Sequence, residues 1–89
     1  MPQKFTKDPD SKLNYMINWA SWLDTDTIDS SEWTVTTGLT KVSDSNTTTT
    51  ATVILSGGTA GTVYEAVNTI NTAGSLIEPR TIYINIDDR

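Results

Sequence analysis

The stretch from Ala51 to Ile70 constrains the fold of this chain more than any other part of the sequence. In each half of it, apolar residues recur at every second position, which places them on one face of a β-strand. These residues are Ala51, Val53 and Leu55 in the first half, and Tyr64, Ala66 and Ile70 in the second. The stretch therefore predicts two strands separated by a glycine-rich turn. Asn68 shares the apolar face of the second strand, so we expect a hydrogen bond to it from a loop or from edge-strand backbone.

The turn between these strands has a more specific spacing. Gly61 lies three residues before Tyr64, which opens the second strand. This arrangement is typical of a tyrosine corner, in which the phenol bonds to backbone a few residues upstream and holds the crossing between two sheets. We therefore predict an immunoglobulin-like β-sandwich with Gly61 and Tyr64 as structural residues. The competing interpretation is a plain hairpin in which Tyr64 is an ordinary strand aromatic.

The composition agrees with an all-β protein. Threonine and serine are abundant, and β-branched side chains suit a pleated surface. A chain of 89 residues has the size of one sandwich domain with about seven antiparallel strands. A core this small depends on a few large side chains, and Trp19, Trp22 and Trp33 are the obvious ones. Either Trp19 or Trp33 fits the central aromatic position of such a sandwich.

Further strands are predicted from the same period of two. Leu13 to Trp19 alternates as a half-buried strand, although a helix is the competing interpretation there, and residues 20–23 are expected to form a bulge or short turn. Strands are also predicted at residues 31–35 and 39–42. The threonine run at residues 47–50 is expected to be an exposed strand or hairpin edge, and Arg80 to Ile86 a core strand.

The first eleven residues are polar and contain Pro2 and Pro9. Because proline lacks the amide donor and makes the preceding residue extended, we predict an extended N-terminal arm at residues 1–11 and a sandwich domain at residues 12–89. A frayed terminus without a role is the competing interpretation.

Catalytic and cofactor sites are not predicted. The chain has neither cysteine nor histidine, which excludes disulfides, thiolate metal sites and the commonest general base. The segment GGTAGT lacks the lysine of a phosphate-binding loop. Asp24, Asp26 and Asp29 could supply oxygen ligands to Ca²⁺, but the pattern lacks the glycine and glutamate of an EF-hand, so we favour a solvated acidic loop.

Charge and hydropathy exclude two further classes of partner. The net charge of −5 disfavours binding to nucleic acid, which depends on clustered lysine and arginine. We also expect no membrane partner, since no apolar run is long enough to cross a bilayer, and no signal peptide. The expected location is therefore a reducing cytoplasm, or a larger particle assembled there.

Several segments together resemble the small tailed-bacteriophage proteins known as fiber-tail adaptors. These segments are KDPD and LNY between Lys7 and Tyr15, Trp19 with Trp22 and Leu23, TIDSSEWTV (27–35), GLT (38–40), LSGGTAGTVY (55–64) and RTIYINI (80–86). The resemblance implies a non-catalytic structural protein of the virion, present in several copies in a ring around the tail or neck. It implies an immunoglobulin-like or similar sandwich and no cofactor.

Contacts with neighbouring chains are expected at the arm. By the resemblance and by their position outside the predicted core, Lys7, Asp8, Pro9 and Asp10 are the candidate partner-binding residues. Such an arm could add to an exposed edge strand of a neighbour. The alternative function is a carbohydrate- or protein-binding immunoglobulin-like module, for which Tyr83 and Trp22 are the only candidate exposed aromatics.

Overall fold

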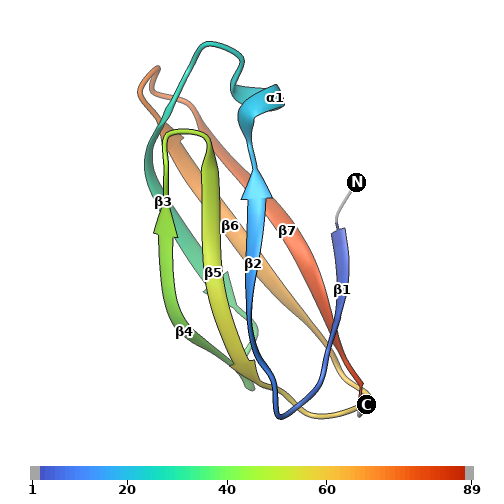
Figure 1. Ribbon diagram of the computed structural model, residues 1–89. Helices are drawn as coiled ribbons and strands as arrows, with labels where there is room; N and C mark the ends of the chain where they lie inside the picture. The colour runs from blue at the N-terminus through green and yellow to red at the C-terminus, as the bar shows by residue number, and fades with distance from the viewer. Residues whose placement is uncertain (1–2, 88–89) are drawn as a thin grey trace.

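The computed structural model describes residues 3–87, and in this part of the chain seven strands form two sheets (Figure 1). The elements are β1 (Gln3–Lys7), β2 (Lys12–Asn18), α1 (Ala20–Leu23), β3 (Ile28–Val35), β4 (Leu39–Asn46), β5 (Thr50–Gly57), β6 (Val63–Thr72) and β7 (Ile77–Ile86). One sheet has the strand order β1-β7-β6-β3 and the other has the order β2-β5-β4. The predicted all-β class is confirmed.

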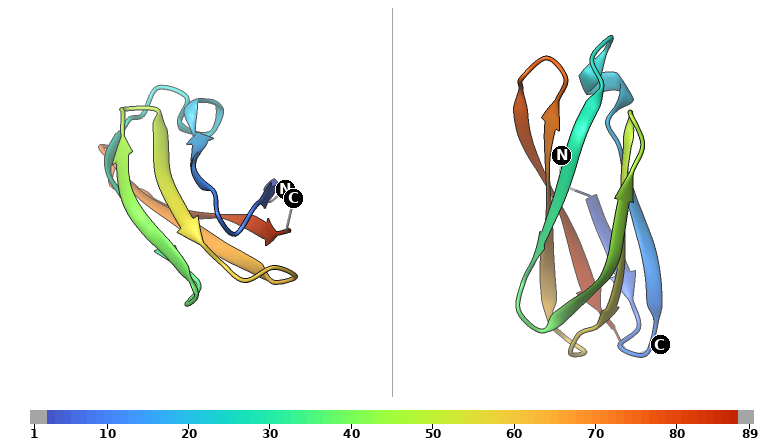
Figure 2. Two further views of the ribbon diagram at one scale, coloured as in Figure 1. Left: turned by 60° about the horizontal axis from the view of Figure 1, so that its bottom comes forward. Right: turned by 90° about the vertical axis from the view of Figure 1, so that its left-hand side faces the viewer.

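The two sheets face each other across a single core, as the right-hand view of Figure 2 shows. Its residues come from the alternating sets of both sheets, because every second side chain of a strand points inward. In β5 the buried residues are Ala51, Val53 and Leu55, and in β7 they are Ile82, Ile84 and Ile86. Trp19 and Trp33 are both buried, so the core contains both candidates for its central aromatic. Period-two patterning thus predicted the centre of the fold.

The N-terminal segment corrects the prediction of a separate arm. Gln3–Lys7 forms β1, which pairs in parallel with β7, from Gln3 opposite Ile82 to Lys7 opposite Ile86. Phe5 packs against the core, with its ring centroid 4.9 Å from that of Tyr15. Residue 11 is therefore no boundary between an arm and a domain, and the strands are not all antiparallel. Residues 1 and 2 of the predicted arm lie outside the described residues.

The segment after β2 forms the one-turn helix α1 where a bulge or short turn was expected. Leu23 of this helix is buried and closes that end of the core, whereas Trp22 remains 38% exposed. Of the inward set on β2, Tyr15 and Ile17 are buried but Leu13 is not. No helix in the described part of the chain has the length and apolar character needed to cross a membrane.

The connection between β4 and β5 contains most of the threonine run, which was expected to be an exposed strand or a hairpin edge. Residues 47–49 form a turn, and only Thr50 of the threonine run enters a strand. The Thr47 hydroxyl accepts hydrogen bonds from the amides of Thr49 and Thr50, at 3.3 and 3.0 Å. Such local bonds from a hydroxyl to backbone favour a turn over a continued strand.

Candidate partner-binding surface

Lys7, the first of the candidate contact residues, is fully buried at the end of β1. Its Nζ donates hydrogen bonds to the carbonyl oxygen of Gly57 at 2.7 Å and to that of Asp8 at 2.8 Å. Burial lowers the pKa of the Lys7 ammonium, while the nearby charges of Asp8 and Asp10 act in the opposite direction. The side chain of Lys7 therefore fastens β1 to the end of β5 and is not presented to a partner.

The other three candidates form a tight turn between β1 and β2. Asp8 Oδ1 accepts a hydrogen bond from the Asp10 amide at 2.8 Å, and the Asp8 carbonyl accepts one from the Ser11 amide at 3.0 Å. Asp8 and Pro9 are half-buried, whereas Asp10 is exposed. The bonds from Asp8 are those of an Asx-type turn, which pre-forms the loop. Of the four candidates, Asp10 is the one most accessible to another protein.

The glycine-rich turn lies at the same end of the molecule as this loop (Figure 1). The Tyr64 hydroxyl accepts a hydrogen bond from the Thr59 amide at 3.0 Å, across the segment that passes from one sheet to the other. Gly61 has φ +85°, a conformation that side chains disfavour, and its amide donates to the Ile86 carbonyl at 2.8 Å. Gly58 has φ +98°, and a Cβ there would lie 2.7 Å from the Ile86 side chain.

Backbone contacts join the turn and the β1 end into one unit. The Asp87 amide donates to the Lys7 carbonyl at 2.9 Å, and the Ile86 amide donates to the Thr62 carbonyl at 3.0 Å. With the bond from Lys7 to Gly57, these contacts connect β1, the sheet crossing and the end of β7. We call this region, residues 7–11, 57–64 and 86–87, the corner end. The sequence did not predict that these segments meet, because their contacts join distant positions, such as Lys7 and Gly57, which are 50 residues apart.

The acidic segment lies at the opposite end of the molecule, next to α1. Asp26 Oδ1 accepts hydrogen bonds from the amides of Thr27 at 2.8 Å and Gly74 at 3.0 Å. A side-chain hydrogen bond from Thr72 and these backbone bonds lower the pKa of Asp26. Within residues 3–87, no three acidic side chains come close enough together to hold a metal ion. Asp26 acts instead as a structural link between the loop before β3 and the β6–β7 turn.

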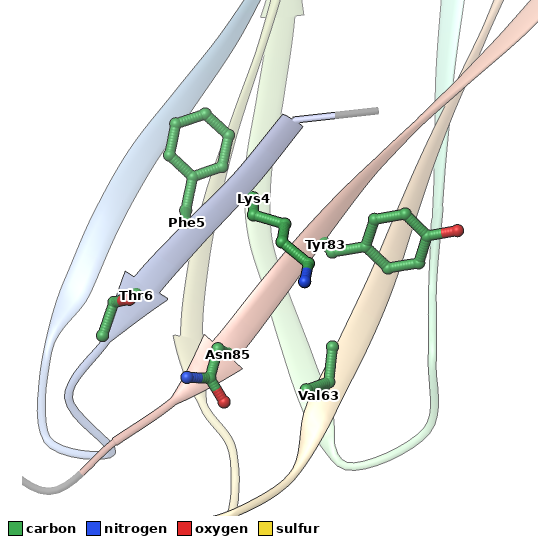
Figure 3. Close-up of a pocket in the computed structure, with 6 residues that line it drawn as sticks. All are labelled: Lys4, Phe5, Thr6, Val63, Tyr83 and Asn85. Carbon is green, nitrogen blue, oxygen red and sulfur yellow. The ribbon is translucent and has the colours of Figure 1, made fainter. Parts of the chain in front are cut away.

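A shallow hollow of about 270 Å³ lies on the outer side of the β1-β7-β6-β3 sheet. It is lined by Lys4, Phe5, Thr6, Val63, Tyr83 and Asn85. Figure 3 shows the Lys4 side chain directed toward Tyr83, whereas the Phe5 ring points away from the hollow. The polar groups that line the hollow thus include one cation, one phenol and one amide.

The two candidate sugar-binding aromatics do not share a face. Tyr83 lines this hollow on β7, whereas Trp22 belongs to α1 and packs edge-on against Trp19, with ring centroids 5.4 Å apart. A carbohydrate module stacks sugar rings on neighbouring exposed aromatics, so the geometry offers no such platform from this pair.

A buried polar cluster at the α1 end was only partly foreseen from the sequence. Asn68 Oδ1 accepts a hydrogen bond from Trp19 Nε1 at 2.9 Å, and Asn68 Nδ2 donates to Ser31 Oγ at 2.8 Å and to the Glu32 carbonyl at 3.2 Å. The guanidinium of Arg80, which lies opposite Asn68 in the sheet, stacks 4.2 Å from the Trp19 ring. The edge-strand carbonyl was expected, but the pairing with Trp19 was not.

A comparison with protein families places these features in context. The model of the family described as Podophage GP4 fiber-tail adaptor protein gp77 matches residues 7–85. The chain belongs to this family. The match begins at Lys7 and ends one residue before Ile86, so it includes the polar cluster and residues 7–11 and 57–64 of the corner end, and it confirms the resemblance found in the sequence. No curated protein matches the chain.

Proposed function

We propose that the protein is a non-catalytic structural component of a podophage virion that joins fibers or other tail components to the particle through protein–protein contacts. The observation that carries this proposal is the family match over residues 7–85, which covers nearly the whole of both sheets. A match of this extent spans all of β2 to β6 and most of β7, which is far more than a shared motif. Several copies act together in a ring at the tail or neck, assembled in the host cytoplasm.

We further propose that the fold is immunoglobulin-like. In that fold one sheet contains strands B, E and D and the other contains C, F and G, with a tyrosine corner before strand F. Here β2, β5 and β4 form one sheet, and β3, β6 and β7 lie together in the other. Tyr64 occupies the corner position at the start of β6. Strand order and corner geometry support the same assignment.

The turn at Asp8, Pro9 and Asp10 is the partner-binding site in this proposal. Lys7 supports the turn from within the core, since its ammonium also binds the Asp8 carbonyl. Asp10 extends from a pre-formed loop, which lowers the entropy cost of binding. The carboxylates at this end favour a partner with a basic surface.

The test replaces Asp10 by lysine and measures incorporation of the protein into particles. In a phage complementation assay, Asp10→Lys should reduce the amount of protein in purified particles by about tenfold or more, equivalent to about 1.4 kcal/mol of binding free energy. Asp29→Lys is the matched control, because Asp29 is an exposed aspartate in β3. Circular dichroism of both variants checks that they fold.

Two outcomes would contradict the proposal at different levels. Normal incorporation of Asp10→Lys would exclude the turn as the contact but leave the adaptor role standing. Absence of the wild-type protein from purified particles would overturn the adaptor role itself.

A further inference from the structure

In the part of the chain that the structure describes, four strands have an edge without a paired neighbour, and three of these edges carry features that discourage further strand pairing. In β3 the pairing register shifts between Ile28 and Ser30, and in β4 it shifts between Lys41 and Ser43. β1 is only five residues long and exposes Lys4. Bulges, short length and lysine are the devices by which proteins prevent unwanted pairing at sheet edges.

The fourth free edge, that of β2, has none of these devices over most of its length. β2 pairs with β5 in unbroken register from Lys12 opposite Ser56 to Asn18 opposite Thr50. After Lys12 at its start, it contains no charged residue, proline or glycine. Among residues 3–87, β5 is the only strand that pairs with β2. The amides and carbonyls on its other side therefore make no strand pairing within these residues.

Apolar side chains flank this edge on both faces of the sheet. Leu13, in the inward set of β2, is 42% exposed, and Met16, in the outward set, is 51% exposed. Neighbouring members of the inward set, Tyr15 and Ile17, are buried. A strand added beside β2 with apolar residues on both faces would cover Leu13 and Met16 together.

The surroundings favour a single strand over a second folded domain. In Figure 1 and in the left-hand view of Figure 2, β1 lies beyond β2 on the side away from β5. The contact between Phe5 and Tyr15 holds β1 against the inner side of this edge. β1 and the Phe5 ring therefore flank this edge on its inner side, and they would obstruct the second sheet of another sandwich more than one extended strand.

We propose that the free edge of β2 accepts an extended, uncharged segment of a neighbouring tail component as a fourth strand of the β2-β5-β4 sheet. Backbone hydrogen bonds supply the affinity, and alternating apolar side chains on the partner, against Leu13 and Met16, fix its register. That the partner is a tail component rests on the proposed function. The absence of a paired neighbour at this edge of β2 is independent of the proposed function.

The experiment combines edge variants with amide hydrogen exchange on particles that contain the full chain. Met16→Lys places a charge on the edge, and Val42→Lys is the matched control, because Val42 is 47% exposed on the bulged edge strand β4. We expect Met16→Lys to lower incorporation by about tenfold or more and Val42→Lys to leave it unchanged. Mass spectrometry should show that peptides covering β2 exchange at least about tenfold more slowly in particles than in the isolated protein.

The outcomes separate this inference from the adaptor role. Normal incorporation with β2 amides exchanging at the rate of the isolated protein would overturn strand addition while leaving the adaptor role intact. Absence of the wild-type protein from particles would overturn both. A concentration-dependent dimer of the isolated protein in sedimentation, with the same β2 protection, would identify a second copy as the occupant and would exclude the heterologous segment. If Met16→Lys does not fold, the exchange comparison on the wild-type protein still decides the question.

Discussion

Asn68 lies in the middle of β6 and is fully buried. Its side chain makes hydrogen bonds to three other polar groups. Its amide joins Trp19 from the β2–α1 junction to Ser31 and Glu32 of the edge strand β3. A buried polar side chain is tolerated only when its bonds are made, so this asparagine fixes the relative position of three segments. The sequence revealed it as an exception to the alternation. It could not reveal the indole partner, which lies 49 positions away.

Replacing Asn68 by leucine should therefore destabilise the protein strongly. Asn68→Leu leaves the Trp19 indole N–H buried without its acceptor, so we expect the free energy of unfolding to fall by about 1–3 kcal/mol. Asn71→Leu on the same strand is the control. Asn71 is exposed and bonds only peripherally to Ser30, so its replacement should change stability by less than about 0.5 kcal/mol. Urea unfolding of both variants measures the difference, and equal losses would contradict the role assigned to Asn68.

At the scale of the element, β1 shows why the fold could be predicted only in part. β5, β6 and β7 were found from the sequence because their apolar residues alternate over five to seven positions. In contrast, β1 has one large apolar residue, Phe5, and its sequence otherwise resembles a polar tail. Its partner strand lies almost 80 residues away, as the pairing of Gln3 with Ile82 shows. Pairing between residues so far apart produces no local pattern in the sequence.

The same limit applies to the candidate site. The hydrogen bond from the Thr59 amide to the Tyr64 hydroxyl spans five residues, so its spacing could be recognised in the sequence. The bond from Lys7 to Gly57 spans fifty, and lysine is rarely buried, so Lys7 was taken for a surface residue. Residues whose roles depend on local geometry were predictable, and those whose roles depend on distant partners were not.

The packing of β1 yields a prediction for the element as a whole. Phe5→Ala should lower the free energy of unfolding by about 1–3 kcal/mol, less than the loss at a fully buried phenylalanine because Phe5 is only partly buried. Lys4→Ala, at the neighbouring position on the opposite face, should change it by less than about 0.5 kcal/mol. Thermal or urea unfolding measures both changes. A neutral Phe5→Ala would mean that β1 is held by backbone pairing and Lys7 without help from the ring.

For the whole molecule, Asp26 couples stability to pH. Its pKa is lowered from 3.8 in the folded protein, so the folded state binds this proton less readily than the unfolded state. The stability that Asp26 contributes is therefore present above pH 3.8 and is lost as the pH falls through the lower folded value. Asp26→Asn should unfold at a lower temperature than the wild type at neutral pH, and the difference should shrink in strong acid. Asp29→Asn, at an exposed aspartate of β3, serves as the control. A difference for Asp26→Asn that is independent of pH would contradict this coupling.

The parallel pairing of β1 with β7 also has a mechanical consequence. Because the two strands run in the same direction, the beginning of β1 and the end of β7 lie at opposite ends of their shared interface. Tension applied between those two points shears the strands past each other and loads all of their hydrogen bonds at the same time. Peeling the bonds apart one by one requires a different direction of pull. A force along this axis would therefore be resisted by all of the hydrogen bonds between β1 and β7 and by the buried Lys7 at the end of β1.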